Sequence, residues 1–365
     1  MRKPRVDYIF LFACLALTAI GSIMIFSASP TMALKLGDSY YFLKRHIFYL
    51  LLGFSALYFG LRLDLRILKK WAALILGLSI VLLLLVYIPG VGKNISGASR
   101  WINLLGFSFQ PSELIKFTMI LFLAGWLSKA GKKIEDFFLG LLPPLILVGA
   151  VCALIISQPD LGTAIAIAGT AFIMFFIAGA KSLHLALLGL VGISGVIGLS
   201  LTSPYRLRRI VAFIDPWKDP QGTGFHIVQS LLAVGSGGLF GLGLGASKQK
   251  FFYLPQQFTD FIFAILCEEM GFLGGAVVVV LFLIMAGRGF RIAYKARDRF
   301  SFLLATGLVS WLTLQALINI MVVLGMLPTT GIPLPFISYG GTATIVGLFS
   351  VGILLNISLT EVQAK

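Results

Sequence analysis

Apolar stretches long enough to cross a lipid bilayer recur along almost the whole chain. Of its 365 residues, 58% are hydrophobic and only 12% carry a charge, which is more apolar surface than the core of a soluble protein can use. The pattern predicts an all-α polytopic membrane protein, with a single domain over residues 1–365. We expect about ten transmembrane helices, near residues 8–28, 46–62, 72–90, 111–128, 138–157, 160–180, 183–203, 261–286, 301–327 and 334–357.

The Lys and Arg residues between these stretches predict the orientation of the helices. With the N-terminus inside, the inner segments hold 17 basic residues and the short outer loops hold five. Because basic residues are enriched in cytoplasmic loops, both termini are expected to be cytoplasmic. The longest loop, about 204–260 between the seventh and eighth helices, then lies outside. The net charge of +15 is explained by this topology and by lipid headgroups, and no nucleic-acid partner is expected.

Four polar motifs, each near a proline, precede the helices that are predicted to run from outside to inside. They are Gln110-Pro111-Ser112-Glu113, Gln158-Pro159-Asp160, Thr259-Asp260 and the stretch from Pro333 to Gly341. The N-terminus of such a helix points free N–H groups and the positive end of its dipole outward. Four helix starts on one face predict a binding site for an anion such as a phosphate.

Asp260 stands at the end of the run Tyr253-Leu254-Pro255-Gln256-Gln257-Phe258-Thr259, directly before a predicted span. A carboxylate at a water–lipid boundary can be ionised yet partly dehydrated, a setting in which it can act as a base. Asp260 is therefore the candidate catalytic residue. Glu268 and Glu269 lie deeper along the same helix and are expected to pack against polar groups in the bundle.

Four other charged residues are candidates for substrate binding, each with a simpler explanation. Glu113 and Lys116 share one helix face and would form an ion pair inside the membrane, which marks a site, but Glu113 can equally cap its helix. Arg100 lies beside Trp101 at the outer interface and is either an anion ligand or an anchor. Asp160 is either a ligand or a helix cap.

The outer loop contains three further signals. The run Arg206 to Ile214 mixes basic and apolar residues, which predicts an interfacial helix on anionic headgroups. The glycine-rich stretch 235–245 fits neither nucleotide-binding fingerprint and is predicted to be a flexible turn. Lys248 and Lys250 follow it, as two cations that can meet a phosphate. No disulfide and no metal site is expected, because three cysteines lie far apart in apolar runs: Cys14, Cys152 and Cys267.

Several short motifs occur together in one order along the chain. They are Arg100-Trp101-Ile102, Gln110-Pro111-Ser112-Glu113 with Lys116, Gln158-Pro159-Asp160-Leu161-Gly162-Thr163, Gln229-Ser230-Leu231, Gly235-Ser236-Gly237-Gly238, Gln249-Lys250, Tyr253-Leu254-Pro255, Thr259-Asp260-Phe261-Ile262-Phe263-Ala264, Glu268-Glu269, Gly331-Ile332-Pro333-Leu334-Pro335-Phe336 and Ser338-Tyr339-Gly340-Gly341. Over essentially its whole length the chain resembles the SEDS proteins of bacterial shape, elongation, division and sporulation (FtsW, RodA and SpoVE), and most of all the FtsW and SpoVE branch. It departs from the family pattern at Gln256, often Glu, and at Thr342-Ala343, commonly two serines.

The resemblance implies a peptidoglycan glycosyltransferase of the bacterial cytoplasmic membrane, which polymerises lipid II into glycan strands and releases undecaprenyl pyrophosphate. It implies a class B penicillin-binding protein as transpeptidase partner, together with other division or elongation proteins. The essential aspartate of the family falls on Asp260. Substrate-binding residues are expected to be Arg100, Glu113, Lys116, Asp160, Lys248, Lys250 and Ser338. A divalent cation, Mg²⁺ or Mn²⁺, that bridges Asp260 and the pyrophosphate is left open.

The residues fit this chemistry. Asp260 would take the proton of the acceptor sugar's 4-hydroxyl, and nearby cations would stabilise the departing pyrophosphate. One in-line attack with inversion needs no second carboxylate, unlike ordinary glycosidases.

Two other classes of function compete with this reading. A lipid II flippase would explain the number of helices and the intramembrane charges, and a non-catalytic division scaffold would explain the number of helices alone. The polar motifs gather on one face and not at the midplane, which favours an enzyme.

Overall fold

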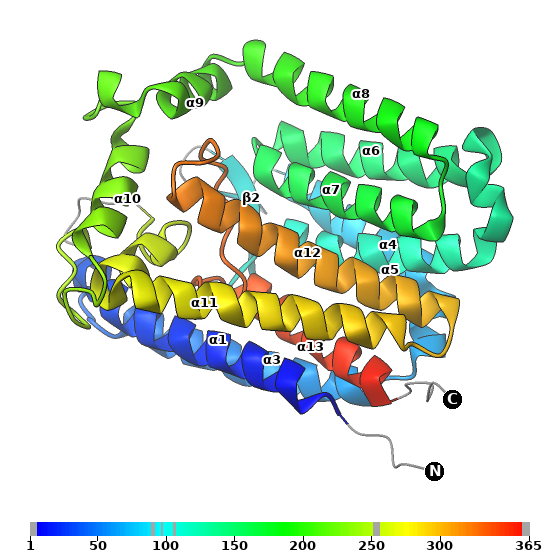
Figure 1. Cartoon of the computed structure of the whole chain (residues 1–365), viewed down its shortest axis with the longest axis horizontal. Coiled ribbons are helices and arrows are strands. Elements are labelled where there is room, and N and C mark those ends of the chain that lie inside the picture. Colours follow the sequence, from blue (N-terminus) through cyan, green and yellow to red (C-terminus); the bar gives the residue numbers. More distant parts are fainter. Residues whose placement is uncertain (1–5, 89–91, 96–97, 105–106, 251–255, 360–365) are drawn as a thin grey trace.

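The computed structural model describes residues 6–88, 92–95, 98–104, 107–250 and 256–359. Long helices run side by side in a bundle, and most of the short helices gather toward one end with a small sheet (Figure 1). The start of α1 and the end of α13 both lie at the opposite end (Figure 1). The described chain therefore enters and leaves the bundle on one face.

All ten predicted membrane helices form among the described residues. They are α1 (Tyr8–Ala28), α3 (Tyr41–Arg62), α4 (Leu65–Leu85), α5 (Pro111–Ala130), α6 (Leu142–Ser157), α7 (Leu161–Ala178), α8 (Ser182–Leu201), α11 (Ile262–Tyr294), α12 (Arg299–Val323) and α13 (Gly341–Leu359). By length and composition, nine of the described helices can cross a membrane. The exception among the ten is α3, which has 22 residues but carries Lys44, Arg45 and His46 in its first turns.

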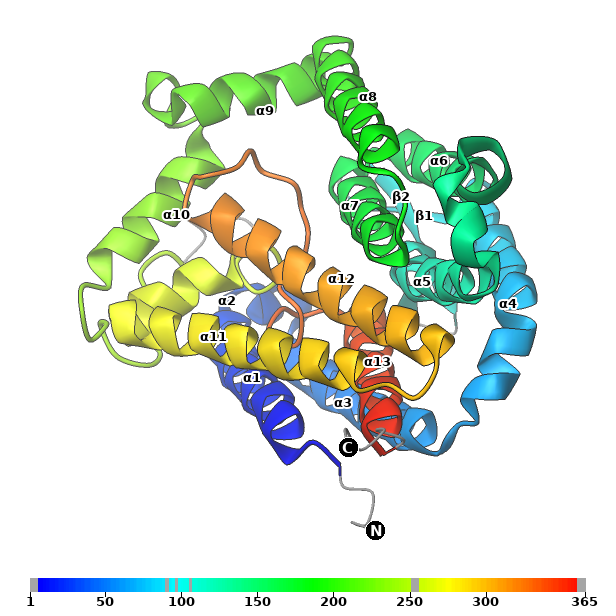
Figure 2. The ribbon, with the colours of Figure 1, turned by 45° about the vertical axis from the view of Figure 1, so that its right-hand side comes forward.

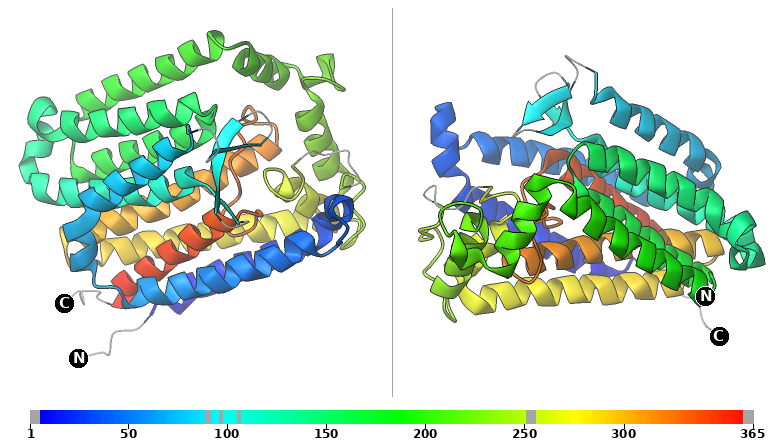
Figure 3. Two further views of the ribbon diagram at one scale, coloured as in Figure 1. Left: turned by 180° about the vertical axis from the view of Figure 1, so that it is seen from behind. Right: turned by 90° about the horizontal axis from the view of Figure 1, so that it is seen from above.

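Shorter elements connect these helices. They are α2 (Pro30–Ala33), η1 (Leu34–Leu36), β1 (Gly92–Ile95), β2 (Ala98–Leu104), β3 (Phe107–Phe109), η2 (Gly131–Glu135), η3 (Phe137–Leu141), α9 (Pro204–Ile214), η4 (Pro216–Lys218) and α10 (Phe225–Ser236). The three strands form an antiparallel sheet in the order β1-β2-β3, which the all-helical prediction did not include. Strand β2 carries Arg100, so the sheet holds this residue at the same end of the bundle as α9 and α10 (Figure 3).

The predicted start of α4, at residue 72, is wrong. The helix begins at Leu65, because Asp64 caps it by accepting a hydrogen bond from the N–H of Arg66 at 2.8 Å. Basic residues interrupt the apolar run there, but their long side chains can reach water while the backbone stays helical. The same reason moves the start of α3 from residue 46 to Tyr41.

The predicted start of the last helix, at residue 334, is also wrong. Pro333 and Pro335 have no N–H to donate to a helix, Phe336 has a φ of 65°, and α13 begins only at Gly341. The segment 331–340 is therefore an irregular loop, and its polar groups find partners outside it, as described below.

The centre of the bundle is α12, and α8 is its edge. In the membrane-spanning part of α12, 78% of the residues are buried, whereas in that of α8 only 6% are buried. In Figure 2, α8, α9 and α10 form an arc around one side of α12. The run Arg206 to Ile214, which was predicted to be an interfacial helix, is helical and belongs to α9. Arg206 ties it to α8 and α6 through the carbonyls of Leu199 and Ile156, at 3.2 and 3.3 Å. Its contact with lipid headgroups stays a prediction.

Helices α3 and α13 pack closely because small residues lie between them. A Cβ on Gly352 would lie 2.2 Å from the carbonyl oxygen of Leu57, and one on Gly60 would lie 2.9 Å from that of Phe349. Membrane helices that cannot rely on the hydrophobic effect for association use such close approaches to gain packing contacts.

Helix α11 is broken at Gly271, where φ is 68° and ψ is −168°. The stretch after α10 repairs the break: the N–H groups of Leu242 and Gly243 donate to the carbonyls of residues 268 and 269, each at 3.0 Å. In return, the N–H groups of residues 272–273 donate to the carbonyls of residues 238–239, at 2.8 and 3.2 Å. The turn predicted within 235–245 does form, after α10 ends at Ser236, but hydrogen bonds fasten it to α11.

Substitution of Gly271 by alanine should destabilise the protein. The new Cβ would lie 2.3 Å from the backbone nitrogen of Gly241, and alanine is strained at this positive φ. We expect a loss of about 2–4 kcal/mol, measured by thermal unfolding of the purified protein. Gly287→Ala, in the same helix and with nothing within 4 Å of the new Cβ, is the matched control. Equal melting temperatures for the two variants would show that the break in α11 does not require glycine at position 271.

Candidate active site

Asp260 lies in a turn that leads into α11 from the loop predicted to be on the outer side. The N–H groups of Thr259 and Phe261 both donate to the carbonyl of Gln256, at 3.2 and 3.3 Å, which closes the turn. Asn319 of α12 donates through Nδ2 to the carbonyl of Asp260 itself at 2.8 Å. The backbone of Asp260 is thus held from both sides, while its side chain is half-buried.

The irregular loop 331–340 runs against this turn. Ser338 donates its hydroxyl to the carbonyl of Thr259 at 2.6 Å and accepts a hydrogen bond from the N–H of Leu334 at 2.7 Å. The N–H of Tyr339 donates to the carbonyl of Phe258 at 2.9 Å. Ser338 is next to Asp260 in space, as the sequence suggested, but its hydroxyl is used to join the two loops.

Arg100 and Asp160 meet beside the start of α7. Asp160 caps that helix by accepting from the N–H of Thr163 at 3.1 Å, so the simpler explanation of this residue is confirmed. Arg100 donates through Nε to the carbonyl of Gln158 at 2.8 Å and bonds the carbonyl of Pro159. Its Nη1 is 3.8 Å from Oδ2 of Asp160. Arg100 therefore binds the α6–α7 connection, which fixes where its charge lies.

The charges of three elements act on Asp260. Burial raises the pKa of the Asp260 carboxyl, and the charge of Asp160 raises it further. The guanidinium groups of Arg209 and Arg100 and a hydrogen bond from Thr259 oppose this, and the pKa comes to about 6. A carboxyl with this pKa is ionised at neutral pH and still basic enough to accept a proton.

Arg209 was not among the predicted site residues. It belongs to the basic run of α9, whose charges were assigned to lipid headgroups. In the structure its Nη1 donates to the carbonyl of Thr329 at 2.8 Å, and its guanidinium lies 4.5 Å from the ring centre of Tyr205. Nothing in the spacing of the basic run distinguishes Arg209 from its neighbours, so only the fold identifies it.

Glu113 and Lys116 form a buried ion pair, with Nζ of Lys116 2.8 Å from Oε1 of Glu113 and each side chain at most 3% exposed. Lys116 also donates to Oε1 of Gln315 at 2.9 Å and lies over the ring of Trp311. Glu113 bonds Lys116 instead of capping α5, whose N-cap residue Gln110 makes no side-chain cap bond. The pair thus links α5 to α12 in the interior.

A line of polar side chains on α12 connects this pair to the Asp260 turn. Gln315 donates to the carbonyl of Pro333 at 2.9 Å, and Asn319, one helical turn further, donates to the carbonyl of Ile332 at 2.8 Å. Neither amide was among the predicted site residues. The signal was present, because amide side chains four residues apart in an apolar span are unusual and share one face.

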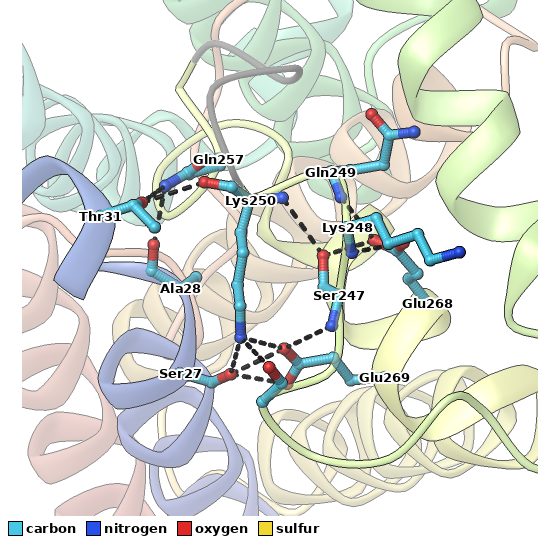
Figure 4. Close-up of polar contacts among 11 residues, drawn as sticks. Ser27, Ala28, Thr31, Ser247, Lys248, Gln249, Lys250, Gln257, Glu268 and Glu269 are labelled. Carbon is cyan, nitrogen blue, oxygen red and sulfur yellow. Dashed lines mark hydrogen bonds and ion pairs between the residues drawn. The ribbon is translucent and has the colours of Figure 1, made fainter.

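The fold separates Lys248 from Lys250 (Figure 4). Nζ of Lys250 is 3.1 Å from Oε1 of Glu269 and is 3.4 Å from Oγ of Ser27, and the residue is only 6% exposed. The side chain of Lys248 points away from this cluster and is exposed. Its backbone N–H, with that of Gln249, donates to the carboxylate of Glu268. The expectation that Glu268 and Glu269 pack against polar groups is confirmed.

The open question of a divalent cation concerns Asp260. Among residues 6–88, 92–95, 98–104, 107–250 and 256–359, no three His, Cys, Asp or Glu side chains are grouped to hold a metal ion. The sequence motif Leu254-Pro255 that precedes the turn lies outside the described residues.

Comparison with known proteins gives consistent matches over the whole chain. The family model FtsW/RodA/SpoVE, described as "Cell cycle protein", matches residues 8–363. Stage V sporulation protein E of Bacillus subtilis (strain 168) is 47% identical over 98% of both chains. A probable peptidoglycan glycosyltransferase FtsW of Geobacter sp. (strain M18) is 46% identical, again over 98% of both.

Two solved structures share the fold. One is a chain reported under "Structural coordination of polymerization and crosslinking by a peptidoglycan synthase complex", with a TM-score of 0.82, 30% identity, and coverage of 98% of this chain and 99% of that one. The other is the rod shape determining protein RodA of Thermus thermophilus, with a TM-score of 0.71, 28% identity and coverage of 98% of both chains.

Removal of one partner of the Glu113–Lys116 pair should be costly. Lys116→Met leaves the Glu113 carboxylate buried without its counter-ion, which we expect to lower the free energy of unfolding by about 3–5 kcal/mol. The double variant Glu113→Gln with Lys116→Met removes both charges and should recover most of that loss. Thermal unfolding in one detergent measures both effects.

The exposed pair of Lys44 with Asp38, also at 2.8 Å, offers a matched control. Lys44→Met should change the melting temperature little, because water screens this pair. A melting temperature of Lys116→Met equal to that of the wild type would show that the Glu113–Lys116 pair is not dry.

Proposed function

Because the chain belongs to the FtsW, RodA and SpoVE family of cell cycle proteins, we propose that it is a peptidoglycan glycosyltransferase that polymerises lipid II. The observation that carries this proposal is the half-buried carboxylate of Asp260, within electrostatic reach of Arg100 and Arg209. A base next to fixed cations suits a reaction in which a hydroxyl loses its proton and a pyrophosphate departs.

The reaction is a single displacement. The carboxylate of Asp260 takes the proton from the acceptor sugar's 4-hydroxyl, and the resulting oxygen attacks the anomeric carbon of the donor. The bond from that carbon to the pyrophosphate oxygen breaks with its electron pair, so the negative charge leaves on undecaprenyl pyrophosphate. The configuration at the anomeric carbon inverts, because there is one attack and no covalent sugar intermediate.

The other residues of the site act on the charge and on the position of the loops. Arg100 and Arg209 stabilise the pyrophosphate, since their guanidinium groups are already held by backbone carbonyls and need little rearrangement. Asp160 orients Arg100, and Ser338 keeps the loop 331–340 against Asp260. The contacts described above support these roles.

The lysines act at a greater distance from Asp260. Lys116, with Glu113, supports the loop through Gln315. The exposed ammonium of Lys248 can reach a lipid phosphate, whereas Lys250 serves the fold through its pairing with Glu269. The pairing of Lys250 with Glu269 favours this structural role over the predicted contact with substrate.

The membrane orientation and the partner belong to the same proposal. The bias of basic residues to one set of loops supports cytoplasmic termini and an active site at the outer face of the cytoplasmic membrane. The likeness to a chain of a peptidoglycan synthase complex supports a partner that crosslinks the product, a class B penicillin-binding protein. Other division or elongation proteins would join this pair.

Asp260→Asn keeps the shape of the side chain and removes the base. In a purified preparation supplied with lipid II, we expect its polymerisation rate to fall by about 10²–10⁴-fold. Asp215→Asn, an exposed acid of the same outer loop, should polymerise at the wild-type rate. Polymerisation by Asp260→Asn at near wild-type rate would remove Asp260 from the mechanism. Transfer of labelled lipid II between leaflets without any polymer would replace the enzyme with a flippase.

The rate should also depend on pH in a defined direction. The pKa of Asp260 is raised from 3.8 to about 6, so the ionised form that acts as a base is lost as pH falls through about 6. Below that pH, kcat/KM should fall roughly tenfold for each unit. A profile that stays flat down to about pH 5 would mean that the base has the ordinary pKa of an exposed aspartate.

A further inference from the structure

The hydroxyl of Thr31 joins two residues of the outer loop that are seven positions apart. It donates a hydrogen bond to the carbonyl of Lys250 at 3.0 Å and accepts one from Nε2 of Gln257 at 2.8 Å (Figure 4). The same nitrogen of Gln257 donates to the carbonyl of Ala28 at 2.8 Å. Thr31 lies in α2, directly after α1, so the outer end of α1 contacts both Lys250 and Gln257.

At the Lys250 end of this connection, an ion pair holds the chain in place. The ammonium of Lys250 pairs with Glu269 of α11 at 3.1 Å, and Ser27 of α1 donates to both oxygens of the same carboxylate at 2.7 Å. Glu269 is 1% exposed and Lys250 is 6% exposed. A buried pair with several hydrogen bonds has little freedom to move, so this side of the connection is anchored to two membrane helices.

The Gln257 side leads directly to Asp260. Gln257 is 2% exposed, and the next residue, Phe258, packs against the rings of Phe42 and Tyr339, with centroids 4.7 and 5.6 Å away. The turn that contains Asp260 begins at Gln256. A shift of Gln257 is therefore passed on to the carboxylate through three residues of a closed turn.

We propose that Thr31 is a positioning residue for Asp260, and that the outer end of α1 with α2, residues 27–31, is the frame that holds the catalytic turn. The inference rests on the role of Asp260 proposed above. Thr31 acts through Gln257 and does not touch substrate, so its loss should lower the rate of the chemical step and leave substrate binding unchanged.

Thr31→Val removes the hydroxyl and keeps the shape, whereas Thr31→Ser keeps the hydroxyl. In lipid II polymerisation by the purified full chain, Thr31→Val should lower kcat roughly ten- to a hundredfold with KM unchanged, as expected for a small displacement of a catalytic group. Thr31→Ser should retain the wild-type kcat. Thr202→Val, at the outer end of α8, is the matched control for the same exchange and should have no effect.

A second variant tests the route through Gln257. Gln257→Met removes the amide from the other end of the contact and should lower kcat at least as much, because Gln257 also donates to the carbonyl of Ala28. The double variant Thr31→Val with Gln257→Met should lose no more than Gln257→Met alone, because both changes break one connection. Losses that multiply would show independent effects and would overturn the inference.

Hydrogen exchange gives a readout that does not depend on catalysis. Amides of residues 256–261 should exchange roughly two- to tenfold faster in Thr31→Val, which corresponds to the loss of one hydrogen bond, and at the wild-type rate in Thr31→Ser and Thr202→Val. Unchanged exchange and unchanged kcat in folded Thr31→Val would overturn the inference. Faster exchange in a protein whose wild type forms no polymer would support the positioning contact and refute the proposed function.

Discussion

Irregular backbone near a bilayer is tolerated only where its N–H and C=O groups find partners inside the protein, and the end of the bundle that holds Asp260 depends on this constraint. The amides of Gln315 and Asn319 allow the loop 331–340 to lie beside Asp260. They donate hydrogen bonds to three backbone carbonyls there, those of Asp260, Ile332 and Pro333. The break at Gly271 is likewise stable because residues 237–243 supply its missing partners. Polar side chains in an apolar bundle thus allow the site to exist.

The same constraint gives the site its electrostatic character. A carboxylate that is half withdrawn from water becomes more basic, and Asp160 adds to that effect. Arg100 and Arg209 then prevent the pKa of Asp260 from rising so far that the group would be neutral at pH 7. These two arginines come from different elements, the strand β2 and the helix α9. In the proposed function, their positions serve two needs at once, an ionised base and a cationic place for a leaving pyrophosphate.

Sequence reasoning succeeded where a property is local. The run lengths predicted ten helices, and the position of Asp260 directly before a span placed it at the start of α11. The prediction of helix ends failed where those ends depend on partners far away in the sequence. Residues 333–340 contain prolines near an apolar run and were predicted to start a helix, yet their polar groups bond to Thr259 and to α12. The pairing of Lys250 with Glu269 could not be foreseen for a similar reason.

By itself, the sequence determined the membrane class, the existence of the ten long helices and the family, because composition, apolar run length and ordered motifs are properties of the chain alone. It also identified Asp260 as the acid to examine. Only the tertiary structure decided which cations lie near that acid. Arg209 and Lys250 look alike in sequence, as basic residues of the connection between α8 and α11, but α9 brings the first within reach of Asp260 and a buried carboxylate holds the second. Distances between residues far apart in the chain are set by how helices pack, and packing depends on every contact at once.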